Sequence, residues 1–222
     1  DAIAEDLEQS LDALGVDSID LYVLHRDDPT VPVDEIVDFL DGEQRAGRIK
    51  RFGASNWTTR RIEEANSYAE RAGKHGFALS SPNLSLAVPK EPRWAGCVSV
   101  ATEDLAWYER TQLPLFSWSS QAGGFFTGAF RPDVRDDAEM VRVYYSEENW
   151  ARLDRARSLA KARGVEAVHV ALAYVLSQGF PTFALIGPKN REELLASTQH
   201  ADMRLTPDEV RWLDGRLSGS GR

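Results

Sequence analysis

The sequence predicts an α/β fold of the (β/α)8 barrel type with about five parallel strands. Short apolar segments alternate with amphipathic segments along the chain, an order typical of parallel sheets, because a helix joins each strand to the next. Four of the apolar segments end in polar or aromatic side chains, and a (β/α)8 barrel carries its active site at the carboxyl ends of its strands. These strand ends lie at His25, at Ser55, at Trp118 and just before Lys189.

The first part of the chain is predicted to form three helices and three strands. Apolar residues recur at helical spacing from Ile3 to Leu14, and Gly15 ends that helix. Pro32 stands where a first helical turn would begin, and Gly47 is the expected cap at the other end. The predicted elements are helices 3–14, 32–46 and 59–72 and strands 19–24, 51–54 and 77–80.

The later part continues the alternation, with two long loops. Thr206 opens a capping box that starts the last helix. The predicted elements are a loop 81–96, a helix 102–111, a strand 113–118, a loop 121–145, helices 146–162 and 165–176, a strand 182–186, and helices 191–199 and 207–217. We expect one domain over residues 1–217 and a disordered tail over 218–222. An eight-stranded barrel would need three more strands before Asp1.

The composition excludes several classes of protein. The 222 residues are 42% hydrophobic and 27% charged, as in a globular protein with a substantial core. The net charge of −9 and the absence of a Lys/Arg run argue against nucleic acid as a partner. No apolar run approaches the ~18 residues of a membrane span, and no signal peptide is visible. The single cysteine, Cys97, excludes an internal disulfide and fits a reducing compartment, so we expect a cytoplasmic protein.

Polar side chains directly follow two of the early strands. A neutral imidazole at His25 could donate a hydrogen bond to a substrate carbonyl, although a histidine that only caps the strand end is the alternative. The hydroxyl of Ser55 and the amide of Asn56 can together satisfy a ligand carboxamide. The alternative for this pair is a turn that starts the helix at Thr58 or Thr59.

The later strand ends carry an indole and two cations. The face of Trp118 suits stacking on a planar ring such as nicotinamide, although a core tryptophan is the alternative. The glycines of segment 122–128 could let the backbone approach a pyrophosphate, or could simply make the loop flexible. Lys189 and Arg191, near a helix N-terminus, could bind a 2′-phosphate, or could form a solvated basic turn. No Cys/His cluster has metal-ligand spacing, so no metal is expected.

In this order and with these gaps, the segments closely resemble the aldo-keto reductases, which reduce carbonyls with NADPH. The most specific stretch is 10–25, SLDALGVDSIDLYVLH, and the resemblance covers essentially the whole chain, from the family's fourth strand to its C-terminus. It implies that His25 is the catalytic histidine and that the cofactor is NADP(H). The implied cofactor contacts are Ser55 and Asn56 at the nicotinamide carboxamide, Trp118 on the nicotinamide ring, Ser119, Gly123 and Gly124 at the pyrophosphate, and, in the turn from Gly187, Lys189, Asn190 and Arg191 at the adenosine phosphate.

The sequence departs from the family pattern at several positions. Ser81 stands where the family carries a carboxamide-binding glutamine. Glu193 and Ser197 replace the usual Gln and Asn that meet the adenine, and an acid at 193 would mildly repel a phosphate. No residue aligns with the family's catalytic tyrosine, lysine and aspartate. Loss of that general acid would slow hydride transfer roughly 10²–10⁴-fold.

These observations leave three hypotheses. The first is an NADP(H)-dependent reductase of a small aldehyde or ketone. Its remaining strands and its proton donor would come from an N-terminal segment, or from self-association or a second chain that completes the barrel. The second is a non-catalytic protein, derived from such a barrel, that binds a nucleotide or a partner. The third is an isomerase or lyase on the same barrel. The substrate is expected to be set by the loops 81–96 and 121–145.

Overall fold

The computed structural model describes residues 2–217, which divide into two compact units between Ser80 and Ser81. The first unit holds α1 (Ala2–Leu14), β1 (Ile19–Leu24), α2 (Val33–Arg45), β2 (Ile49–Ser55) and α3 (Thr59–Ala72), and β3 (Ser80–Ser81) spans the division. The second holds α4 (Thr102–Thr111), β4 (Leu115–Ser117), η1 (Ala122–Thr127), α5 (Ala138–Tyr144), α6 (Glu147–Arg163), α7 (Ala167–Leu176), β5 (Thr182–Ala184), α8 (Arg191–Thr198) and α9 (Pro207–Leu213). The expected tail 218–222 lies outside the described residues, and the single domain over 1–217 stays a prediction.

The strands follow one another in the sheet in chain order, β1-β2-β3-β4-β5, and the sheet is parallel. In the first unit Leu24 lies opposite Ala54, so β1 and β2 end at the same level. In the second unit Ser117 lies opposite Ala184, so β4 and β5 also end together. The predicted α/β fold is confirmed, and each pair of strands presents its carboxyl ends side by side.

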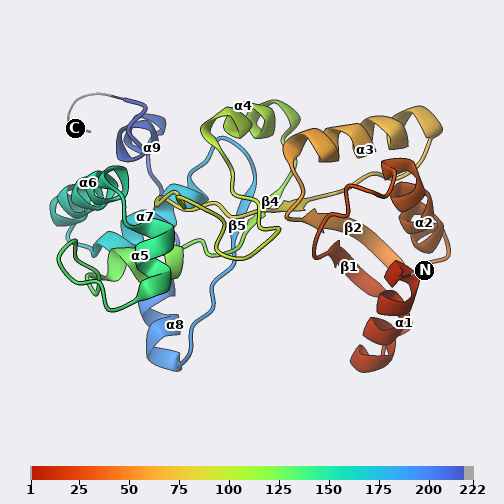
Figure 1. The fold of residues 1–222 in the computed structure, drawn as a ribbon, viewed down its shortest axis with the longest axis horizontal. Coiled ribbons are helices and arrows are strands. Elements are labelled where there is room, and N and C mark those ends of the chain that lie inside the picture. Colours follow the sequence, from red (N-terminus) through yellow and green to blue (C-terminus); the bar gives the residue numbers. More distant parts are fainter. Residues whose placement is uncertain (1, 218–222) are drawn as a thin grey trace. The chain divides into compact units, whose positions relative to one another are not determined.

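In the first unit, α2 and α3 lie along one side of β1 and β2, and α1 lies next to β1 (Figure 1). Val37, Phe52 and Ile62 have no exposed surface and form the core of the α2–α3 layer. Strand β2 passes close to the segment before β3, because a Cβ at Gly53 would lie 2.6 Å from Leu79 Cγ. Only glycine therefore fits at this point of the strand.

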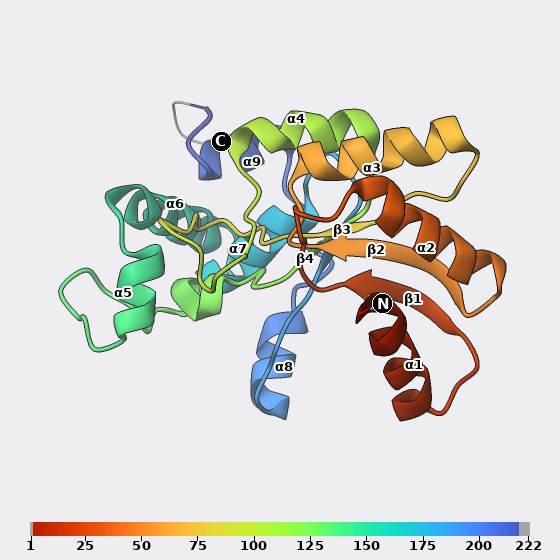
Figure 2. The same cartoon turned by 45° about the vertical axis from the view of Figure 1, so that its right-hand side comes forward.

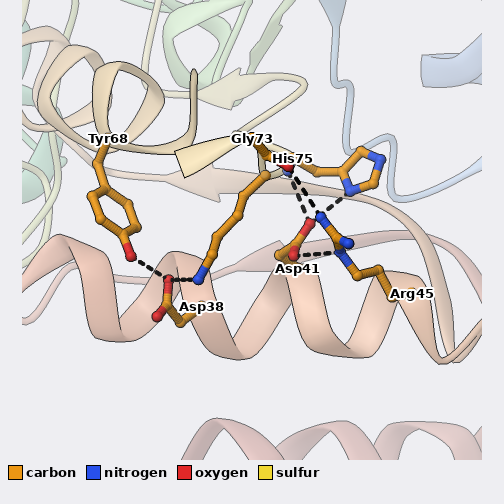
Figure 3. A network of polar contacts seen from close by, with 7 residues as sticks. Asp38, Asp41, Arg45, Tyr68, Gly73 and His75 are labelled. Carbon is orange, nitrogen blue, oxygen red and sulfur yellow. Dashed lines mark hydrogen bonds and ion pairs between the residues drawn. The ribbon is translucent and has the colours of Figure 1, made fainter. Parts of the chain in front are cut away.

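Two carboxylates of α2 tie this helix to the chain after α3 (Figure 3). Asp41 is 4% exposed and accepts hydrogen bonds from His75 N at 2.9 Å, His75 Nδ1 at 2.7 Å and Arg45 Nε at 2.7 Å. Burial acts to raise the pKa of Asp41, but the hydrogen bonds from His75 and Arg45 outweigh it and hold the pKa below its ordinary value. One turn earlier, the more exposed Asp38 pairs with Lys74.

In the second unit, the prediction that residues 121–145 form a loop is wrong, because this segment contains η1 and α5. Asp137 caps the start of α5, and its side chain accepts a hydrogen bond from Met140 N at 2.9 Å. It is stable because Met140 and Val143 are buried. Figure 2 shows α8 apart from the helices α5 and α6 of the same unit, and none of its residues is buried.

Three smaller expectations also need correction. Pro32 is the cap before α2 and not its first helical residue, because its ψ of 141° is extended. The expected strand 77–80 pairs with β2 through Ala78 N to Phe52 O, but regular strand structure covers only β3. The last helix ends at Leu213, and Gly215 follows with a left-handed φ of 89°. Within residues 2–217, no helix is both long and apolar enough to cross a membrane.

Candidate active site

The first group of predicted site residues lies where β1 and β2 end. His25 is the residue after β1 and is exposed, whereas Ser55 ends β2 and Asn56 follows it, both at least nine-tenths buried. Because the two strands end at the same level, the structure brings these three predicted residues together in the first unit.

The Asn56 amide connects the two strand ends. Its Nδ2 donates to His25 O at 3.2 Å and to Ser55 Oγ at 3.0 Å. Asn56 adopts a left-handed φ of 59°, which asparagine tolerates better than most residues. Helix α3 is capped instead by Thr58, whose hydroxyl accepts from the N–H of Arg61 at 3.2 Å. Ser55 and Asn56 therefore do not act as the helix cap, and the amide positions the main chain at His25.

Arg61 holds the loop after His25 and was missed by the sequence analysis. Its Nε lies 3.3 and 3.2 Å from the two carboxylate oxygens of Asp27, and its Nη2 donates to Asp28 O at 3.2 Å. Its guanidinium also lies 5.2 Å from the centre of the Trp57 ring. Burial raises the pKa of Asp27, and the nearby Arg61 only partly offsets this effect.

Ser81 forms a hydrogen bond to the main chain of the second unit. Its hydroxyl donates to Phe116 O in β4 at 2.8 Å. Two residues later, Asn83 Nδ2 donates to Trp118 O at 3.0 Å. These side chains fix the end of β4 against the neighbouring segment, so they set the position from which Trp118 projects.

A compact left-handed turn follows Trp118. Ser119 and Ala122 have φ values of 50°, and Gly123 and Gly124 have values of 62° and 86°. The positive φ at Gly123 favours glycine, and a Cβ there would also crowd Met140 Sδ, at 3.2 Å. The segment expected as a flexible loop is therefore the ordered 3-10 helix η1, with a kink at the two glycines.

The turn from Gly187 to α8 forms a reciprocal cap. Asn190 Oδ1 accepts from Glu193 N at 2.8 Å, and Glu193 Oε2 accepts from Lys189 N at 2.7 Å. Lys189 and Arg191 are exposed, and within residues 2–217 neither takes part in an ion pair. Glu193 thus accepts a hydrogen bond from a main-chain N–H at the helix start, and anion binding by the two cationic side chains stays a prediction.

Side chains connect this turn to the one after Trp118. Ser120 Oγ donates to Leu185 O at 2.8 Å, just beyond β5. Ser197 Oγ in α8 lies 3.3 Å from Gln121 Oε1. The second unit therefore brings the predicted indole, glycine and cation positions into one linked region. Neither Ser120 nor Gln121 was predicted, because their partners are more than sixty residues away in the sequence.

His169 also holds α8 in place and was not predicted. Its Nδ1 accepts from Glu166 N at 3.2 Å, and its Nε2 lies 2.8 Å from Ala196 O. The first bond requires an unprotonated Nδ1, so Nε2 carries the proton and donates to Ala196. Among residues 2–217, no cluster of three or more His, Cys, Asp or Glu side chains could hold a metal ion.

Comparison with known proteins assigns this arrangement to a family. The family model described as "Aldo/keto reductase family" matches residues 1–217. The chain is 28% identical over 219 residues to the uncharacterized oxidoreductase YrpG of Bacillus subtilis (strain 168). That alignment covers 99% of this chain and 64% of the relative. The chain is 26% identical over 219 residues to versiconal hemiacetal acetate reductase of Aspergillus parasiticus, covering 96% and 61%.

A solved structure has the same fold. The crystal structure of the thermostable aldo-keto reductase Tm1743 with the inhibitor epalrestat matches with a TM-score of 0.71 at 20% identity, covering 96% of this chain and 65% of that one. The chain thus spans less than two thirds of the length of these proteins. Because the family model matches residues 1–217 and the fold agrees with that of a solved aldo-keto reductase, the chain belongs to the aldo/keto reductase family.

Proposed function

We propose that this chain carries the cofactor-binding part and the catalytic histidine of an NADP(H)-dependent reductase of aldehydes or ketones. The observation that carries the proposal is the junction of His25 with Ser55 and Asn56, in which the Asn56 amide bonds to the main chain of His25. Membership of the aldo/keto reductase family supports it, since that family typically uses NAD(P)H.

Each group of residues fits one part of such a cofactor. Ser55 and Asn56 are buried polar groups beside the exposed His25, which suits a carboxamide held next to a reacting carbonyl. Trp118 offers an aromatic face, and Gly124 leaves the backbone open because a Cβ there would meet only Thr127, at 3.6 Å. The cations Lys189 and Arg191 suit the adenosine phosphate.

The chemistry assigned to this chain is orientation of the substrate. Bound NADPH would supply the hydride for reduction of the carbonyl carbon. The imidazole of His25 would donate a hydrogen bond to the carbonyl oxygen and so hold it in position. The proposal gives no residue of this chain the role of proton donor, so binding, and not turnover, is the decisive first test.

The test is a titration of tryptophan fluorescence with NADPH and with NADH. We expect saturable binding of both, tighter for NADPH, and loss of that preference when Lys189→Gln and Arg191→Gln are combined. The matched control combines Lys161→Gln and Arg71→Gln, which removes two exposed cations of α6 and α3 and should keep the preference. Absence of binding of either nucleotide would reject the reductase proposal and favour the non-catalytic alternative.

A further inference from the structure

A buried imidazole, His169, joins α7 to α8 in the second unit. His169 is 6% exposed and lies in the first turn of α7. Its Nδ1 accepts a hydrogen bond from Glu166 N at 3.2 Å, and its Nε2 lies 2.8 Å from Ala196 O in α8. With the proton on Nε2, the neutral ring satisfies the donor before α7 and the acceptor in α8 at the same time.

A protonated ring cannot keep both bonds. A proton on Nδ1 makes this atom a donor, and it would then face the N–H of Glu166, which is also a donor. The positive charge would lie beside the first turn of α7, where the helix dipole disfavours a cation. Within residues 2–217 the only imidazole with a carboxylate partner is that of His75, so a charge on His169 would be buried and unpaired.

The surroundings of His169 do not supply the missing negative charge. The centre of the His200 ring, which follows α8, lies 4.5 Å from the centre of the His169 ring, so a proton on His200 would add a second positive charge. The acids on the surrounding segments are all exposed to solvent: Glu166, Glu192, Glu193 and Asp202. The cations there are exposed as well: Lys161, Arg163, Arg191 and Arg204.

Of the two helices that His169 joins, α8 is the one that can leave. Residues Val168 to Val175 of α7 are all buried, whereas no residue of α8 is. The side-chain links of α8 to the rest of the unit include the bond from His169 and the contact of Ser197 Oγ with Gln121 Oε1 at 3.3 Å. Departure of α8 therefore brings water to the ring without exposing the core residues of α7.

We propose that acidification releases α8 from α7 through protonation of His169, so that this imidazole is a pH-sensitive switch. Imidazoles ordinarily gain their proton between about pH 8 and pH 5. Because the released state binds one more proton, the ratio of released to docked α8 should rise up to about tenfold for each unit by which the pH falls. Helix α8 begins at Arg191, beside Lys189, so its release should also weaken nucleotide binding. Only this last step rests on the proposed function.

The test measures hydrogen exchange of the α8 and α7 amides, as protection factors, at about pH 7.5 and about pH 5.5. In the wild type we expect the protection of α8 to fall about tenfold or more at the lower pH, and that of α7 to stay the same. In His169→Gln the amide can accept from Glu166 N and donate to Ala196 O but cannot titrate, so α8 should stay protected at both pH values. His75→Gln, which removes an imidazole of the first unit, is the matched control and should behave as the wild type.

Three results would each overturn the proposal. The first is protection of α8 that does not depend on pH in the wild type, and the second is the same pH dependence in His169→Gln. The third comes from nitrogen-15 shifts of the His169 ring, which report its tautomer and its titration midpoint without any variant. A proton on Nδ1 at neutral pH, or a midpoint different from that of α8 release, would contradict the switch even if His169→Gln failed to fold.

A titration with NADP+, which is stable in acid, tests the consequence for nucleotide binding. Between the two pH values we expect the affinity of the wild type to fall about tenfold more than that of His169→Gln, because the variant corrects for titration of the nucleotide itself. An equal fall in both proteins would overturn the link between α8 and the nucleotide. Release of α8 by acid, without binding of NADP+ at either pH, would reject the proposed function and retain the switch.

Discussion

Removal of the Asp41 carboxylate should destabilise the first unit strongly. Asp41→Ala deletes the acceptor of the His75 main-chain N–H, of the His75 ring and of the Arg45 guanidinium. These groups lie in the chain after α3 and in α2 itself, so the substitution unties the chain after α3 from α2 (Figure 3).

The expected loss is about 2 kcal/mol, because only part of the network is shielded from water. The side chains of Arg45 and His75 are 59% and 50% exposed, so they regain water when Asp41 is truncated and their bonds contribute little. The main-chain N–H of His75 loses its acceptor, which costs about 1–3 kcal/mol for a shielded donor. With a urea m-value of about 1–3 kcal/mol/M, the midpoint of unfolding should fall by roughly 1 M.

The loss should also depend on pH. The pKa of Asp41 lies below its ordinary value of 3.8, so its contribution is complete above that pH and disappears as the pH falls through the lower folded-state value. The difference between wild type and Asp41→Ala should therefore stay constant down to about pH 4 and then shrink.

Urea unfolding, followed by circular dichroism, and hydrogen exchange in α2 and α3 measure this effect. Asp38→Ala is the matched control, since it removes the same side chain one turn earlier from a site that is 47% exposed, and its effect should be smaller. Equal unfolding midpoints for wild type and Asp41→Ala would refute the reasoning. So would a difference in midpoint that stays the same below about pH 4.

Two further substitutions each test a contact between residues far apart in the sequence, one within each unit. Asn149→Ala leaves the main-chain groups of Val88 without their buried partner and should lower the free energy of unfolding by about 2–4 kcal/mol, with faster hydrogen exchange in the loop 88–94; unchanged exchange there would contradict the anchoring role. Arg61→Met leaves Asp27 in its half-buried site without a cation, so its pKa, read from carbonyl chemical shifts, should rise further. An unchanged pKa would show that Arg61 does not act on this carboxyl.

Local features of the sequence determined most of the helices. Helix α1 is followed by Gly15 with a left-handed φ of 65°, and α4 covers 102–111 as predicted. The capping box at Thr206 is present as expected. Periodicity, caps and glycines act over three to five residues, so they can be recognised without knowledge of the fold. The order of polar residues at the strand ends also identified the family, since that order depends on the chain alone.

The tertiary structure alone decided which side chains meet. Arg61 lies 34 residues from Asp27, and Asn149 lies 61 residues from Val88. Helix α5 and the 3-10 turn at Gly123 replace a predicted loop because they bury residues against the rest of the second unit. Pairs so distant in sequence leave no periodic signal, because their formation depends on closure of the intervening chain and on burial that neither segment has alone.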